Sequence, residues 1–270
     1  MANPPKIDNL TSRRILLWHQ GLCRPPKRRI TSSQLQSLIE ELGFVQLDSV
    51  ATVERAHHMI LFSRNETYRP ELLRRLLEKE RSLFENWTHD ASVIPSRFFP
   101  YWKPRFERDA EKLKLSWRKW HGYDFEPYLQ HLLGHIEKQG PARSRDFKVP
   151  RDTSSDGWWN WHPAKTALEY LWRTGRLAVV RREGFQKVYD LTPRVIPSLH
   201  LDQEPGEGEF LDWSCREALN RLGVATAGEI SAFWDSVSPA EASGWCFEKC
   251  ASGEIREVLL DGLPGEPARK

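Results

Sequence analysis

The stretch "HPAKTALEYLWRTGRLAVVRREGFQKVYDL" (162–191) contains the clearest architectural pattern in the chain. Its first half has apolar residues at helical spacing, with Pro163 near the beginning and Gly175 at the end. Its second half is typical of two strands joined by a basic, glycine-containing turn. Residues 125–147, just before it, predict two further helices separated by a Gly-Pro break. Three helices followed by a hairpin is the order of a winged helix, and the helix at 164–174 would be its recognition helix.

A winged helix that binds DNA needs basic side chains on its recognition helix and on its wing. We predict that Lys165 and Arg173 provide them on the helix, and that Arg181, Arg182 and Lys187 provide them at the wing tip. The alternative is a winged helix that serves only to pack against the rest of the protein.

Similar helical pairs are predicted on both sides of this unit. Residues 10–22 and 30–43 have the pattern of two amphipathic helices with polar caps. The turn between them is basic, and we expect four of its cations to bind DNA phosphate: Arg24, Lys27, Arg28 and Arg29. Another helical pair and a short strand follow an acidic, glycine-rich connector near the end. The patterns predict a mainly α fold with small β hairpins, built from winged-helix or helix-turn-helix modules at 1–122, 123–200 and 201–270.

The segment 53–121 is predicted to be mostly helical, including the strongly amphipathic stretch that runs through Trp87. From 97 to 120 it alternates aromatic with basic residues, a pattern that suits stacking on bases and pairing with phosphates. The alternative is a helix pair with an aromatic core and a solvated charged face.

Composition sets limits on the class of protein. A net charge of +3 over 270 residues, with a pI near 8.6, is too mildly basic to argue for a nucleic-acid partner by itself. The four cysteines are scattered, and the sequence shows neither a signal peptide nor an apolar run long enough to span a bilayer. We therefore expect a soluble protein in the reducing cytoplasm.

Motifs for several familiar chemistries are missing from the sequence. It contains no phosphate-binding loop, no dinucleotide fingerprint, no nucleophile elbow and no H-E-x-x-H. The pairs His19/Cys23 and Cys246/Cys250 have helical spacing, but neither has an evident second half for a zinc site. We predict neither a cofactor nor a metal.

Two polar residues interrupt an otherwise apolar strand pattern, "GFVQLDSV" (43–50). Because successive side chains of a strand point to opposite faces, Gln46 and Asp48 share one face, whereas Val45 and Leu47 share the other. A buried carboxylate without a cation is costly, so Asp48 should either cap the following helix or face a solvent-filled cleft. In a cleft, the pair would hold a water molecule, with one residue as base or electrostatic partner and the other as an orienting amide.

Four stretches together resemble the winged-helix DNA glycosylases of the AlkZ/YcaQ type, which excise alkylated purines and can unhook interstrand crosslinks: "VQLDSV" (45–50), "VERAHHMILFSR" (53–64), "FENWTHDASVIP" (84–95) and "GPARSRDF" (140–147). The resemblance extends from about residue 8 to about residue 260. It implies that Gln46 and Asp48 are the Gln-x-Asp version of the catalytic motif. It also implies tandem winged helices in a C-shaped arrangement, with a C-terminal barrel-like part that we expect to be truncated after "VLLDGLPG".

The resemblance implies a monofunctional glycosylase that hydrolyses N7-alkylated purines, since the strand motif offers no lysine for a Schiff base. The expected partner is double-stranded DNA with alkylated or crosslinked purines, bound by a monomer. His57 and His89 could line the cleft; a packed histidine at 57, and at 89 a brace against Trp87, are the alternatives. The competing functions are a non-catalytic winged-helix regulator and a helical protein-interaction scaffold.

Overall fold

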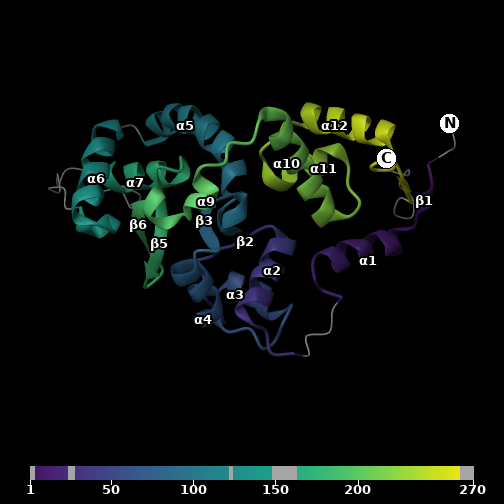
Figure 1. Ribbon diagram of the computed structural model, residues 1–270, viewed down its shortest axis with the longest axis horizontal. Coiled ribbons are helices and arrows are strands. Elements are labelled where there is room, and N and C mark those ends of the chain that lie inside the picture. The colour runs from purple at the N-terminus through teal and green to yellow at the C-terminus, as the bar shows by residue number, and fades with distance from the viewer. Residues whose placement is uncertain (1–3, 24–27, 122–123, 148–162, 262–270) are drawn as a thin grey trace.

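Three hydrophobic clusters organise the chain in the computed structural model, which describes residues 4–23, 28–121, 124–147 and 163–261. Helices dominate the described residues, and the strands form only small sheets of two or three members (Figure 1). The predicted mainly α fold with small β hairpins is confirmed. No described helix has the length and apolar character that crossing a membrane requires.

The N-terminal cluster lies around Leu35, Ile39 and Leu61. A capping box starts its central helix: Thr31 Oγ1 accepts the Gln34 N–H, and the Gln34 side chain accepts the Thr31 N–H. The elements of this region are β1 (Lys6–Ile7), α1 (Asn9–His19), α2 (Ser32–Leu42), β2 (Val45–Gln46), α3 (Ala56–Phe62), α4 (Pro70–Arg75) and a π-helical turn, η1 (Leu76–Glu80).

The stretch 83–95, predicted to be helical as far as Trp87, instead forms two strands, and that part of the prediction is wrong. β3 (Leu83–Trp87) and β4 (Ala91–Pro95) pair as an antiparallel hairpin, and β2 joins the free edge of β4. The helix ends at Arg81, which adopts a left-handed conformation with φ 55°. Burial of β-branched and aromatic side chains in a sheet here outweighs the helical periodicity.

The central cluster contains the helices and hairpin from which the winged helix was predicted. A 3-10 turn, η2 (Ser96–Phe98), leads into this part of the chain. Its elements are α5 (Phe99–His121), α6 (Glu126–Gln139), a 3-10 turn η3 (Ser144–Asp146), α7 (Pro163–Arg173), β5 (Leu177–Glu183) and β6 (Gln186–Leu191). The predicted order of helices and hairpin is present. However, Lys165 is the only exposed residue of α7, so this helix forms the core of its region and has no free face to lay in a DNA groove.

The C-terminal cluster surrounds Trp234, which packs against Phe98 and Trp102 from the first part of α5 and the turn before it. Phe98 and Trp102 therefore belong to the aromatic core and are not available to stack on bases. The elements are α8 (Thr192–Val195), α9 (Ser198–Leu201), α10 (Glu207–Leu222), α11 (Ala227–Trp234), α12 (Pro239–Ser252) and β7 (Leu259–Leu260).

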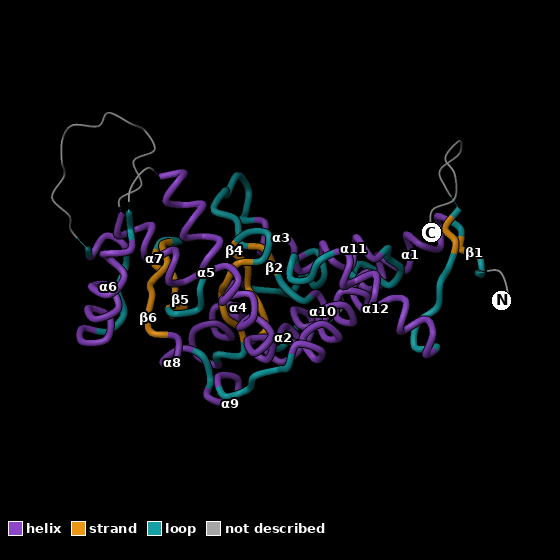
Figure 2. The backbone as a smooth tube through the Cα atoms, turned by 90° about the horizontal axis from the view of Figure 1, so that it is seen from above, coloured by secondary structure: helices purple, strands orange, loops and turns teal. Residues whose placement is uncertain are grey.

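Figures 1 and 2 show an elongated arrangement, with α5–α7 and the β5–β6 hairpin at one end and α10–α12 at the other. Helices α2–α4 lie below the junction of these two groups, so β2 is near the middle of the molecule (Figure 1). At the far end, β1 pairs in parallel with β7, so the first and last described strands lie side by side. The division at 122/123 and 200/201 stays a prediction, and α5 contributes to two of the clusters.

Candidate active site

The alternation predicted from the sequence is present over β2 (Val45–Gln46) and the two residues that follow it. Val45 and Leu47 are buried, with 1% and 6% of their surface exposed, whereas Gln46 is exposed and Asp48 is half-buried. Pairing with β4 fixes this orientation, because Val45 lies opposite Val93, and the Leu47 N–H donates to the Ala91 carbonyl at 2.7 Å. The Gln46 amide therefore lies on the outward face of β2, and Asp48 follows the same alternation two residues beyond the end of the strand.

Asp48 does not cap a helix. Its Oδ1 atom accepts the backbone N–H of Val50 at 2.8 Å, which closes a local turn, and α3 begins only at Ala56. No side chain caps the beginning of α3. The sequence allowed Asp48 either to cap the following helix or to face a cleft, and the structure excludes the helix cap.

A second carboxylate, Asp90, lies beside the pair. Its Oδ2 atom is 3.5 Å from the Gln46 Nε2 atom, and its Oδ1 atom accepts the Ala91 N–H at 2.7 Å. The β2–β4 pairing ends at Gln46 and Ser92, and Asp90 directly precedes Ala91, whose carbonyl accepts the Leu47 N–H. Sequence analysis missed Asp90 because it is 44 residues from Gln46 along the chain, although it stands in the box "FENWTHDASVIP".

Behind the strand, Leu47 lines a hollow of about 310 Å³ together with Arg55, His57 and the β5–β6 turn. His57 is buried, and its ring stacks with Phe185 at 6.1 Å between centroids. Burial above all, and then neighbouring positive charges, lowers the pKa of His57 to about 4, so its imidazole is neutral at pH 7. His57 thus lines a hollow, but on the opposite side of the strand from Gln46.

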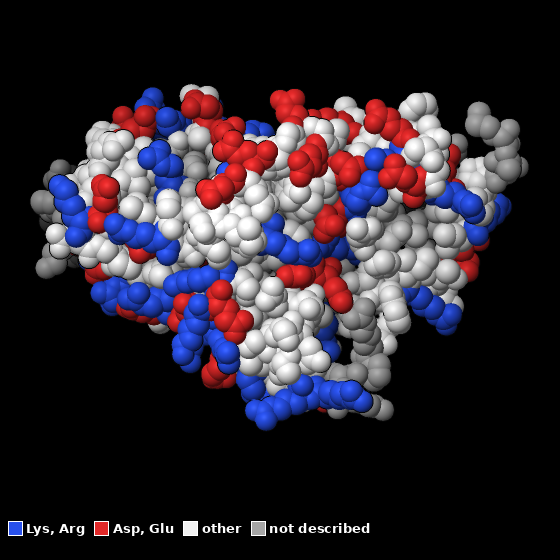
Figure 3. All heavy atoms as spheres, viewed as in Figure 1, with Lys and Arg blue, Asp and Glu red and all other residues white. Residues whose placement is uncertain are grey.

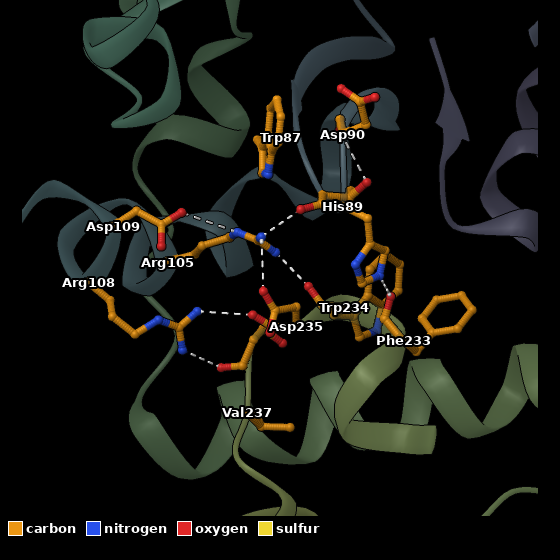
Figure 4. A network of polar contacts seen from close by, with 12 residues as sticks. Trp87, His89, Asp90, Arg105, Arg108, Asp109, Phe233, Trp234, Asp235 and Val237 are labelled. Carbon is orange, nitrogen blue, oxygen red and sulfur yellow. Dashed lines mark hydrogen bonds and ion pairs between the residues drawn. The ribbon is translucent and has the colours of Figure 1, made fainter. Parts of the chain in front are cut away.

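His89 braces the structure, although its partner is not the predicted Trp87. Its Nε2 atom lies 3.0 Å from the Phe233 carbonyl oxygen at the end of α11, as Figure 4 shows. Next to it, the Arg105 guanidinium is buried and donates to the carbonyls of Thr88 at 2.8 Å and Trp234 at 2.5 Å. These contacts fasten the β3–β4 turn, which carries Asp90, to α5 and to the C-terminal helices.

Two of the cations predicted at the wing tip are engaged inside the protein. Arg182 pairs with the buried Glu85, with Nη2–Oε2 at 2.8 Å. Lys187 pairs with Glu169 at 2.9 Å, and its ammonium lies 3.3 Å from the centre of a Trp172 ring. The prediction that these two side chains are available to DNA is wrong, because the hairpin turns its basic side chains toward partners on β3 and α7.

Arg173 is a further correction. Its guanidinium lies 4.0 Å from the centre of the Trp87 ring, and burial lowers its pKa. A cation held against an aromatic face in the interior is not a phosphate contact. By contrast, Lys165 and Arg181 are exposed, and Arg181 forms a surface ion pair with Glu183 at 2.7 Å.

The basic turn between α1 and α2 is only partly described. Arg28 and Arg29 are exposed, whereas Arg24 and Lys27 lie outside the described residues. Figure 3 shows a run of Lys and Arg side chains along the lowest edge of the molecule, below α2–α4, and acidic side chains along the upper edge. On the face seen in Figure 3 the charge is thus unevenly distributed, which the small net charge does not reveal.

The described residues bring together no group of three or more His, Cys, Asp or Glu side chains that could hold a metal ion. The site instead contains the amide of Gln46 on β2 and two carboxylates next to the paired strands, Asp48 after β2 and Asp90 just before β4. Such a site can orient a water molecule and stabilise a positive charge that develops beside it.

Comparisons with known proteins identify the family and the fold. Residues 39–269 match the family described as DNA glycosylase AlkZ-like. The fold is similar to that of the Streptomyces sahachiroi DNA glycosylase AlkZ, with a TM-score of 0.63 over 93% of this chain and 68% of that chain, at 18% sequence identity. The structural likeness bears on the fold, and the sequence match covers most of the chain, including β2 and the β3–β4 hairpin. The chain belongs to the AlkZ-like family of DNA glycosylases.

Proposed function

We propose that this DNA glycosylase hydrolyses the N-glycosidic bond of N7-alkylated purines in duplex DNA, with Gln46 and Asp48 as its catalytic residues. The observation that carries the proposal is the alternation of exposure at the end of β2: Gln46 is exposed and Asp48, two residues beyond the strand, is half-buried, whereas Val45 and Leu47 are buried. Among the described residues the Asp48 carboxylate forms no ion pair; its one hydrogen bond, from the Val50 N–H, leaves the other oxygen available. Its negative charge is therefore available to a substrate.

The chemistry of the lesion explains why an acid and an amide suffice. Alkylation at N7 makes the purine cationic, so the base leaves with the electron pair of the glycosidic bond and becomes neutral. The sugar that remains has oxocarbenium character. Asp48 stabilises that charge and takes the proton of a water molecule whose oxygen bonds to C1′, while Gln46 orients the water. We further propose that Asp90 acts as a positioning residue, since its carboxylate lies next to the Gln46 amide.

The exposure of Gln46 supports an open site, in which a bulky or crosslinked base need not enter a closed pocket. Unhooking of interstrand crosslinks is therefore part of the proposal. The strand motif contains no lysine, so we expect base release without strand cleavage.

DNA binding is proposed to involve the exposed cations of the set predicted from the sequence, namely Lys165, Arg181, Arg28 and Arg29. Each phosphate contact makes binding fall with rising salt, so loss of one such cation should reduce the salt slope by about one.

We also propose that the protein acts as a monomer in the cytoplasm, in line with its four free cysteines. Winged-helix modules at 1–122, 123–200 and 201–270 remain part of the proposal.

Incubation with duplex DNA that carries N7-methylguanine tests this function. We expect the wild type to release the free base and to leave abasic sites that alkali cleaves. Asp48→Asn should lower the excision rate about a hundredfold or more, because the preorganised charge is lost. Glu248→Gln is the control, since Glu248 is an exposed carboxylate on α12 and lies outside the loop that follows Asp48. A wild type that binds duplex DNA but releases no base would favour a non-catalytic regulator and contradict the proposal.

A further inference from the structure

The loop that follows Asp48 is exposed along its whole length and contains two exposed apolar side chains. Every residue from Ser49 to Glu54 is exposed, and the exposed fractions of Val50 and Val53 are 65% and 89%. None of these residues belongs to a helix or strand. Single exposed apolar residues are common on protein surfaces, but folding gains nothing from two valines at the tip of one loop.

This loop is coupled to the proposed catalytic carboxylate. The backbone N–H of Val50 donates to Asp48 Oδ1 at 2.8 Å, so the position of the carboxylate and the base of the loop are fixed together. A fully extended chain advances about 3.5 Å per residue, which limits the Cα of Val50 to about 7 Å from that of Asp48 and the Cα of Val53 to about 18 Å. Successive bases of one DNA strand are about 3.4 Å apart along the helix axis, so Val50 would be within about two base steps of the reacting sugar.

We propose that the loop 49–54 is a wedge that enters the base stack of duplex DNA beside the lesion, with Val50 and Val53 as the inserted side chains. The inference rests on the proposed function of Asp48. Apolar side chains inserted between base steps unstack them and bend the duplex. The partner is duplex DNA and not a protein surface, because the loop is attached directly to the residue that would face the damaged sugar.

The wedge would solve a specific problem of this site. The exposure of Gln46 favours an open site over a closed pocket into which a base could rotate, so access to C1′ would require that the duplex be opened locally. Insertion of the loop would open the stack at that point while the hydrogen bond between Asp48 and Val50 keeps the carboxylate beside the sugar. Bulky and crosslinked bases could then react without leaving the duplex completely.

Fluorescence of 2-aminopurine, which rises when the base is unstacked, tests the proposal without any bond cleavage. The probe is placed next to a stable abasic-site analogue in duplex DNA, and the full chain is added to saturation. We expect a several-fold rise with the wild type and little rise with Val50→Ser/Val53→Ser. Each valine should contribute about tenfold to the affinity for this DNA, as burial of an apolar side chain does. Binding to undamaged duplex, which depends on phosphate contacts, should change less than about twofold.

Two controls separate the wedge from folding and from catalysis. Leu199→Ser removes an equally exposed apolar residue, 70% exposed on α9, and should leave the fluorescence rise intact. Asp48→Asn should keep the rise while losing excision, which separates failure of the chemistry from failure of the wedge. An equal rise with the double serine variant, or no rise with saturating wild type, would overturn the inference.

Discussion

Replacement of Arg105 by methionine should destabilise the protein more than any nearby surface change. The Arg105 side chain is 5% exposed and joins three parts of the structure. It donates to Trp234 O at 2.5 Å and to Thr88 O at 2.8 Å, and its Nε atom is 3.5 Å from the Asp109 carboxylate. Figure 4 shows Arg105 between Asp109 and Trp234.

The expected cost follows from these contacts. Each charge-assisted hydrogen bond to a buried carbonyl contributes about 1.5–3 kcal/mol, and breaking a buried ion pair costs about 3–5 kcal/mol because one charge is left without its partner. Since these contributions overlap, we expect Arg105→Met to lose about 4–6 kcal/mol of unfolding free energy. That is a large part of the roughly 5–15 kcal/mol that stabilises a typical protein, and it corresponds to a fall in Tm on the order of 10 °C.

Urea unfolding followed by tryptophan fluorescence measures this loss, and Arg108→Met is the matched control. Arg108 is on the same helix and donates to the carbonyls of Ser236 and Asp235, but it is exposed, so its removal should cost only about 1 kcal/mol. Asp109→Leu added to Arg105→Met should recover part of the loss, because it removes the unpaired carboxylate. Equal destabilisation by the two arginine variants would refute the reasoning.

Three further predictions concern stability and binding. Lys187→Met should destabilise the protein through loss of the Glu169 ion pair, yet leave the salt dependence of DNA binding unchanged, which a titration at several salt concentrations would show. Gly43→Ala should cost about 2–4 kcal/mol in urea unfolding, because Gly43 has φ +88° and an added Cβ would lie 2.5 Å from Arg221 Nε. The wild type should lose stability as the pH falls from 7 toward 4, since the unfolded state protonates His57 near pH 6.5 whereas the folded state protonates it only near its pKa of about 4. His57→Phe should lose less over that range, and identical pH profiles would disprove this.

Local sequence patterns located most of the helices correctly. The helix predicted over 30–43 is α2, which the structure bounds with a capping box at Thr31 and with Gly43, because these interactions join residues only three or four positions apart. The alternation of Val45, Gln46 and Leu47 is also local, and it gave the orientation of the strand face. The helix predicted through Trp87 failed because pairing between strands decided that segment.

The sequence by itself determined the helical character of the protein, the outward face of Gln46 and Asp48, and the motifs that mark its family, since each depends on residues close together in the chain. Only the tertiary structure decided which cations remain available to DNA and which carboxylate joins Gln46. Arg182 contacts Glu85, which is 97 residues away in the sequence, and Asp90 contacts Gln46, which is 44 residues away. Strand register and burial determine these long-range contacts, and neither can be recognised from the spacing of residues in the sequence.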